Sequence, residues 1–133
     1  MSQENVETIR RAVHAFNERD VDAMLADWAD DVEMRLVGGF ADLMGTEFRG
    51  HEGVRRWFNE WVENVDVRVE IEEIHDAGER VVLVARAVGA GETSGAPVAL
   101  RGGQIYSFRH GLVIGVDNYY EASEALEAAG LSE

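Results

Sequence analysis

The sequence contains no cysteine and no lysine, and each absence excludes a group of functions. Without thiols the chain has no disulfide, no thiolate metal site and no cysteine nucleophile. Because all 12 basic residues are arginine, Schiff-base chemistry and a lysine general base are excluded as well. No disulfide is available to stabilise the fold, and a chain of 133 residues is long enough for one core to do so. We expect a single domain over residues 1–133.

Basic residues are also scarce. The chain carries 26 acidic and 12 basic residues, which gives a formal net charge of −14 at pH 7. A surface of this sign repels phosphate backbones and anionic lipid headgroups, so we expect neither a nucleic-acid nor a membrane partner. The longest stretch without a charged residue, 93–100, is far shorter than the about 20 residues of a transmembrane helix. The acidic N-terminus lacks the apolar run of a secretory signal, which predicts a cytoplasmic protein.

Hydrophobic spacing predicts helices in the N-terminal half of the chain. Apolar residues at helical spacing predict a first helix over residues 4–18. Asp20 is suited to cap a short second helix that reaches Trp28, and a third helix is expected at 51–63. Between them, residues 32–37 predict a short strand, which an unusually apolar loop follows.

From Asp66 onward the hydrophobic period changes to two, which predicts strands. The phase slips at Glu73 and indicates a bulge, while His110-Gly111 suits a two-residue hairpin turn. Helices and strands are thus segregated along the chain, which favours an α+β fold. After the strand from Asp66, the predicted elements are strands at 81–88, 98–109 and 112–120 and a closing helix at 121–129.

Five stretches, among them AFNERDVDA and FRGHEGVR, match a known family pattern: residues 2–7, 15–23, 28–32, 48–55 and 119–131. Through them nearly the whole chain resembles the SnoaL-like, ketosteroid-isomerase-like family of the nuclear transport factor two-like fold. The resemblance implies a cone, in which a strongly curved, mostly antiparallel sheet wraps around about three N-terminal helices and encloses a pocket. Its members include steroid isomerases, polyketide cyclases, epoxide hydrolases and noncatalytic adapters, so it implies no single reaction.

The catalytic patterns of two branches of that family are missing from this chain. Aligned with the steroid isomerases, the tyrosine donor falls on Ala12, the general base near Leu36 and the acid on Gln104. Aligned with the limonene-type epoxide hydrolases, one acid is lost in residues 80–82, and the other falls on Asn118, an amide that does not ionise. No catalytic residue is therefore assigned. The four histidines never fall at ligand spacing, so we expect neither a metal nor a cofactor.

Three polar residues lie among the apolar residues of predicted strand faces, and they point to a ligand site. Arg86, Gln104 and Asn118 each lie in phase with apolar residues that should face the helices. Burying them unpartnered costs about 1–3 kcal/mol each, so they either satisfy one another or face a wet cavity. A mostly apolar pocket with a few polar groups is the usual small-molecule site. The predicted pocket consists of Trp28, Met34, Leu36, Phe40, Trp57, Trp61, Val82, Val84, Arg86, Gln104, Tyr106, Asn118 and Tyr120.

Two functions stay open on this basis. The first is binding of a small apolar or amphipathic molecule, with or without an isomerase, cyclase, lyase or hydrolase step. The second is a noncatalytic homodimeric adapter, because the family resemblance implies pairing through the outer face of the sheet. A homodimer is expected in either case. On that outer face we expect Leu83, Ile105, Ser107 and Val113.

Overall fold

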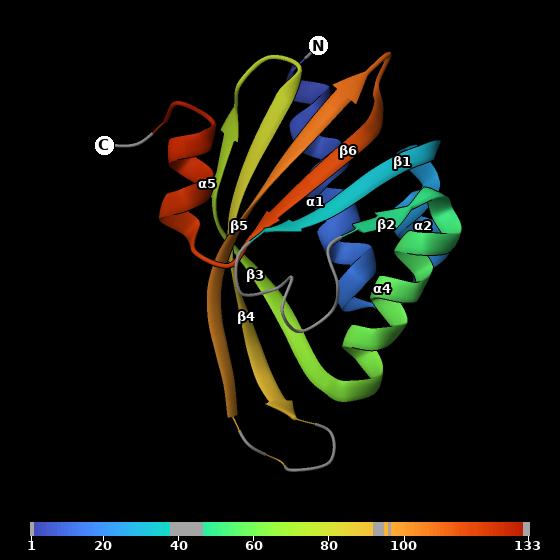
Figure 1. The fold of residues 1–133 in the computed structure, drawn as a ribbon, viewed down its shortest axis with the longest axis vertical. Helices are drawn as coiled ribbons and strands as arrows, with labels where there is room; N and C mark the ends of the chain where they lie inside the picture. The colour runs from blue at the N-terminus through green and yellow to red at the C-terminus, as the bar shows by residue number, and fades with distance from the viewer. Residues whose placement is uncertain (1, 38–46, 92–94, 96, 132–133) are drawn as a thin grey trace.

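A computed structural model describes residues 2–37, 47–91, 95 and 97–131. None of the described helices is long and apolar enough to cross a membrane. The order of elements agrees with the predicted one, from the N-terminal helices to the strand meander and the closing helix. The elements are α1 (Ser2–Asn17), α2 (Val21–Met24), the 3-10 helix η1 (Leu25–Asp27), β1 (Trp28–Val37), β2 (Glu47–Arg49), α4 (Gly50–Asn64), β3 (Val65–Asp76), β4 (Arg80–Gly91), β5 (Pro97–Arg109), β6 (Leu112–Tyr119) and α5 (Ala122–Ala128) (Figure 1).

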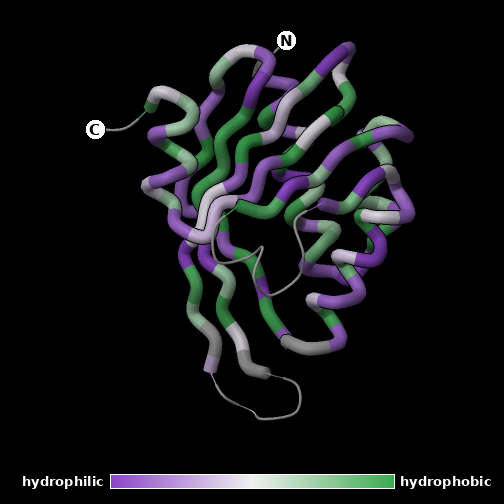
Figure 2. Tube along the Cα trace, in the orientation of Figure 1, coloured by the Kyte–Doolittle hydropathy of each residue, from purple (hydrophilic) through white to green (hydrophobic). Residues whose placement is uncertain are grey.

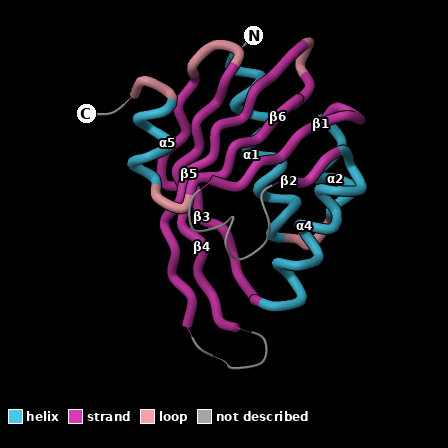
Figure 3. The backbone as a smooth tube through the Cα atoms, in the orientation of Figure 1, coloured by secondary structure: helices cyan, strands magenta, loops and turns pink. Residues whose placement is uncertain are grey.

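The described strands form one sheet in the order β2-β1-β6-β5-β4-β3. Neighbouring strands run antiparallel except β1 and β6, which are parallel. Parallel neighbours need a long connection, and here α4 and four strands lie between β1 and β6 in the chain. Figure 3 shows the strands as one continuous curved sheet, with α5 on one side and the other helices on the opposite side. The predicted α+β class with a mostly antiparallel sheet is confirmed.

The two faces of the sheet pack against different helices. On the inner face, α1, α2 and α4 pack on the strands and form the main core. Hydrophobic stretches accordingly run along the middle strands in Figure 2. On the outer face α5 packs on β4 and β5, where Val82, Ile105 and Ala125 form a second, small core. A Cβ at Gly103 would lie 2.5 Å from the Cβ of Ala125, so α5 fits this closely because residue 103 has no side chain.

Short-range sequence signals predicted several local features correctly. Asp20 precedes α2, and its Oδ1 accepts a hydrogen bond from the Ala23 backbone N–H at 3.1 Å, as an N-cap does. The pairing register of β3 slips just before Glu73, where the bulge was expected. His110 and Gly111 have φ values of 53° and 78°, which suit a two-residue turn between β5 and β6. Each of these signals acts over only a few residues.

The prediction that the second helix reaches Trp28 is wrong. The helix α2 ends at Met24, η1 follows, and Trp28 opens β1. The strand expected at 32–37 therefore begins earlier in the chain, at Trp28. Asp30 and Asp31 lie inside β1 at exposed positions. Two adjacent exposed residues break the strand alternation, and they lie where the register of β1 against β6 shifts, between Trp28 and Glu33.

Asn17, the last residue of α1, ties this helix to the edge strand β3. Its Nδ2 donates to the Val69 carbonyl at 2.9 Å, and its Oδ1 accepts from the Val69 N–H at 2.8 Å. The amide thus uses the edge hydrogen-bonding groups to which a further strand would bind. Arg19 adds a hydrogen bond to the Val67 carbonyl at 2.7 Å. These contacts hold α1 against the strand residues that border the cavity described below.

Replacing Asn17 by alanine is expected to lower the free energy of unfolding by about 1–3 kcal/mol, because both backbone groups of Val69 lose their partner. Urea denaturation measures this value. Asn59, an exposed residue of α4, is the matched control, and Asn59→Ala should change stability by less than about 0.5 kcal/mol. Equal losses for the two variants would contradict the role given to Asn17.

Candidate functional site

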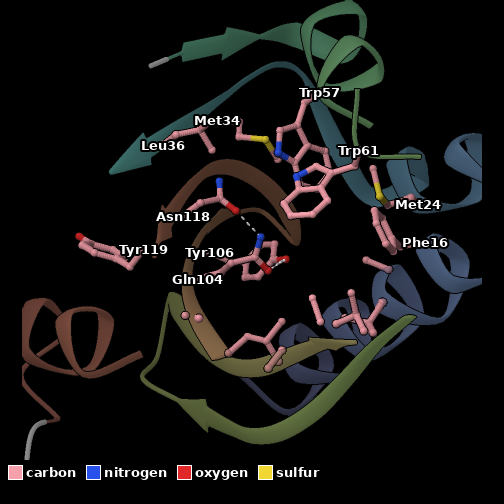
Figure 4. A pocket seen from close by; sticks show the side chains of 18 of the residues that line it. Phe16, Met24, Met34, Leu36, Trp57, Trp61, Gln104, Tyr106, Asn118 and Tyr119 are labelled. Carbon is pink, nitrogen blue, oxygen red and sulfur yellow. Dashed lines mark hydrogen bonds between the residues drawn. The ribbon is translucent and has the colours of Figure 1, made fainter. Parts of the chain in front are cut away.

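A cavity lies between the inner face of the sheet and the helices α1, α2 and α4 (Figure 4). Its volume is about 120 Å³. An apolar cavity of about 150 Å³ binds benzene, so this cavity admits an organic molecule of about one aromatic ring. The described residues that line it are mostly apolar: Ala12, Val13, Phe16, Met24, Trp28, Met34, Leu36, Trp57, Trp61, Val67, Val69, Leu83, Ala85, Ala87, Leu100, Gly102, Gly103, Gln104, Tyr106, Asn118 and Tyr119.

Aromatic side chains form much of the cavity wall. Trp57 and Trp61 are four residues apart in α4, so both project from the same face of that helix, and both point toward Tyr106 in Figure 4. Phe16 of α1 packs against Trp57, with ring centroids 6.0 Å apart. Trp28 opens β1, and its ring meets Tyr106 in an edge-to-face contact at 6.1 Å. All three tryptophans of the chain therefore line the cavity.

Short side chains on the sheet make room for the cavity. The strands β4 and β5 contribute Ala85, Ala87 and Gly102 to its lining. Ala85 lies directly opposite Gly102 in the β4–β5 pairing, and Ala87 lies opposite Leu100. Of these four neighbouring residues, all but Leu100 carry at most a methyl group. The inner face of the sheet therefore leaves space that the helices do not fill.

Three polar side chains form a hydrogen-bonded chain along the cavity wall (Figure 4). Tyr106 Oη donates to Gln104 Oε1 at 2.5 Å, and Gln104 Nε2 donates to Asn118 Oδ1. Asn118 Nδ2 in turn donates to the backbone carbonyl of Arg35 at 3.1 Å. Gln104 and Asn118 lie opposite each other in the β5–β6 pairing, and Asn118 also pairs with Leu36 of β1. Both sequence-based alternatives thus hold for the two amides, which satisfy each other and also line the cavity.

The described lining carries no ionised side chain. It contains no aspartate, glutamate, histidine or arginine. Burial raises the pKa of the Tyr106 phenol. Burial, and then the nearby carboxylate of Asp117, also raise the pKa of Tyr119. Both phenols are therefore neutral near pH 7, and the site can hold a molecule by apolar contacts and neutral hydrogen bonds.

Most of the sequence-predicted pocket residues line this cavity. Phe40 and the rest of 38–46 lie outside the described residues. Phe48, from the same predicted apolar loop, lies in β2, is 1% exposed and packs in the main core rather than in the cavity lining. The predicted residues that line the cavity are Trp28, Met34, Leu36, Trp57, Trp61, Gln104, Tyr106 and Asn118.

The prediction that Val82, Val84 and Arg86 line the pocket is wrong. They project from the outer face of β4, where Val82 packs with α5 and the exposed Arg86 forms an ion pair with Glu72 at 3.2 Å. The alternate residues of β4 line the cavity instead. The reason is that residues 81–84 are all buried, so this part of β4 has no polar face. Such a run does not reveal which of its residues point inward.

Three further side chains lie elsewhere than predicted. Tyr120 follows the end of β6 and is 39% exposed, whereas Tyr119 borders the cavity and also packs against the small core under α5. Strand alternation stops there because the chain continues into α5. Leu83 and Val113, expected on the outer face, pack in the main core. For Val113 the cause is a bulge, since β6 has one more residue than β5 between two successive pairs.

Sequence reasoning missed several lining residues, although signals for some of them were present. Val13 and Phe16 lie on the predicted apolar stripe of the first helix, and such a stripe borders any space left beneath the helix. The small residues of β4 and β5 gave no such signal. The missed residues are Ala12, Val13, Phe16, Met24, Val67, Val69, Leu83, Ala85, Ala87, Leu100, Gly102, Gly103 and Tyr119.

Comparisons with known proteins agree on the fold. A family model described as a SnoaL-like domain matches residues 9–116. No curated protein sequence matches the chain. Among solved structures, an NTF2-like protein of unknown function from Burkholderia pseudomallei superposes with a TM-score of 0.80 at 22% identity, over 93% of this chain and 95% of that chain.

Several of the similar solved structures contain organic molecules. TerC, co-crystallised with polyporic acid, has a TM-score of 0.79 at 20% identity, over 96% of this chain and 98% of its own. A Mycobacterium tuberculosis protein in complex with estradiol-17beta-hemisuccinate has a TM-score of 0.75 at 19% identity, over 89% of this chain and 94% of its own. At these sequence identities the structural likeness establishes a shared fold but does not establish a shared ligand.

Proposed function

Because the chain belongs to the SnoaL-like domain family, in which the fold alone specifies no reaction, we propose its function from the cavity: the protein binds a small, neutral, largely apolar molecule. The observation that carries this proposal is a cavity lined by aromatic and aliphatic side chains and by one hydrogen-bonded polar chain. Small-molecule sites commonly have this composition. The organic molecules held by TerC and by the Mycobacterium tuberculosis protein support binding of an organic molecule, and the neutral charge is argued from the lining of this cavity alone.

The ligand is neutral because the described lining offers no charge to pair with it. An ion that leaves water for an apolar site loses its hydration, and only an opposite charge or several hydrogen bonds offset that loss. Arg86 was the one cation predicted for the pocket, and it projects from the outer face toward Glu72. The anionic end of a ligand therefore has no described cationic partner.

The proposed role is binding rather than catalysis. General acid–base catalysis needs a group near the reacting atoms that exchanges a proton at the working pH. Among the described lining residues, the polar side chains are the two amides Gln104 and Asn118, two neutral tyrosines with raised pKa values, and the indole of Trp28, Trp57 and Trp61. An isomerase, cyclase, lyase or hydrolase step is therefore not part of the proposal.

The adapter function is the weaker candidate, and the homodimer and the cytoplasmic location stay predictions. The outer sheet face expected to pair is occupied in part by α5, which covers Val82 and Ile105. Beside it, Glu72 pairs with Arg86 at 3.2 Å and with Arg101 at 2.6 Å. Less apolar surface therefore remains for a second copy on this face. A native mass measurement on freshly purified protein decides between monomer and dimer and detects a carried ligand.

Indane, a neutral hydrocarbon built on one aromatic ring, tests the proposed function. Because all three tryptophans line the cavity, binding should change their fluorescence in a saturable way, with a dissociation constant below about 1 mM. Calorimetry should then give one site per chain. N-acetyltryptophanamide, titrated in parallel, is the control for quenching in solution. A signal that does not saturate up to the solubility limit of indane contradicts the proposal.

A further inference from the structure

The hydrogen-bonded chain along the cavity wall has a direction, and one backbone group sets it. The carbonyl of Arg35 can only accept, so the amide of Asn118 turns Nδ2 toward it, at 3.1 Å. Oδ1 of Asn118 then faces Gln104 and accepts from its Nε2. Oε1 of Gln104 consequently faces Tyr106, whose hydroxyl donates its only proton there, at 2.5 Å. The backbone of β1 thus decides, through two amides, where the phenol proton points.

This direction determines what the wall offers to a ligand. Tyr106 Oη keeps its lone pairs, and no donor in the described part of the chain reaches them. Gln104 Nε2 has a second N–H, for which the described residues supply no acceptor. Both side chains line the cavity, and they are bonded to each other. The cavity wall therefore presents one acceptor and one donor on adjacent side chains.

We infer that the cavity selects a ligand with a hydroxyl group, which donates its hydrogen to Tyr106 Oη and accepts the second N–H of Gln104. The inference rests on the proposed function, because it describes the polar end of the molecule bound there. A hydroxyl group is donor and acceptor at once, so it satisfies both side chains with a single oxygen, which a carbonyl or ether oxygen does not. The ligand class is a neutral alcohol or phenol with about one aromatic ring.

A carbonyl group fits the same place less well. It accepts from Gln104 but has no hydrogen for Tyr106, whose oxygen stays without a donor. If Tyr106 instead turned its proton to the carbonyl, Oε1 of Gln104 would lose the bond that it has now. In either case one hydrogen bond is missing relative to the alcohol, which corresponds to about three- to tenfold weaker binding.

Three probes with one carbon skeleton test the inference: indane, indan-1-one and indan-1-ol, each titrated calorimetrically into the wild-type protein at neutral pH. We expect indan-1-ol to bind about three- to tenfold more tightly than indan-1-one. Equal affinities, or tighter binding of the ketone, would overturn the preference for a hydroxyl group and leave the proposed function intact. If none of the three probes binds, the proposed function fails and the inference falls with it.

The variant Gln104→Met tests whether the position of the Tyr106 proton causes the preference. Methionine accepts hydrogen bonds only weakly, so the phenol becomes free to donate to the ketone. The affinity ratio of alcohol to ketone should fall to about one. Ser107→Ala, on the outer face of the same strand, is the matched control and should keep the wild-type ratio. An unchanged ratio in Gln104→Met would contradict the mechanism, and the wild-type ratio remains a test whether or not that variant folds.

Discussion

Replacing Ala85 by phenylalanine is expected to weaken indane binding by about a hundredfold, because the new ring takes up most of a cavity of about 120 Å³. Ala85 lies on the inner face of β4 opposite Gly102, where a larger side chain enters the cavity. Calorimetric titration measures the affinity. The far-ultraviolet circular dichroism spectrum shows whether the variant keeps its fold. Undiminished affinity in a folded Ala85→Phe variant would place the binding site elsewhere.

The next residue of the same strand is the matched control. Arg86 projects from the outer face and forms a surface ion pair with Glu72, which contributes roughly 0–1 kcal/mol to stability. Arg86→Leu should therefore keep the wild-type affinity for indane. This pair of variants also tests the corrected orientation of β4. If Arg86→Leu weakens binding and Ala85→Phe does not, the sequence-based orientation was right after all.

Replacing Trp28 by alanine is expected to lower the free energy of unfolding by about 3–5 kcal/mol, the range for buried aromatic residues. Trp28 is 4% exposed, and its ring packs against Tyr106 where η1 joins β1. Its indole N–H is buried and has no acceptor among the described residues. The loss therefore comes from packing and not from a broken hydrogen bond. Urea denaturation monitored by circular dichroism measures it.

Trp61 is the control for this loss of packing. It also lines the cavity but is only partly buried, so Trp61→Ala leaves a smaller void and should cost about half as much. A loss for Trp28→Ala no greater than that for Trp61→Ala would contradict the structural role given to Trp28. Both variants enlarge the cavity, so only stability is compared.

The sequence by itself determined the fold class and much of the site, since the signals involved are local. Helical spacing puts Trp57 and Trp61 on one face of α4 wherever that helix packs. The cap at Asp20 and the turn at His110-Gly111 depend on a few neighbouring residues. The polar character of Gln104 among apolar strand residues was enough to single it out as a pocket residue.

Only the tertiary structure decided which face of β4 lines the cavity and how Gln104 meets Asn118. An alternating pattern identifies the inner face only when the other face meets water, and α5 removes water from the outer face at Val82. The pairing of Gln104 with Asn118 depends on the β5–β6 register, which a bulge shifts beside Val113. Both outcomes follow from contacts between segments far apart in the chain, so no local pattern could encode them.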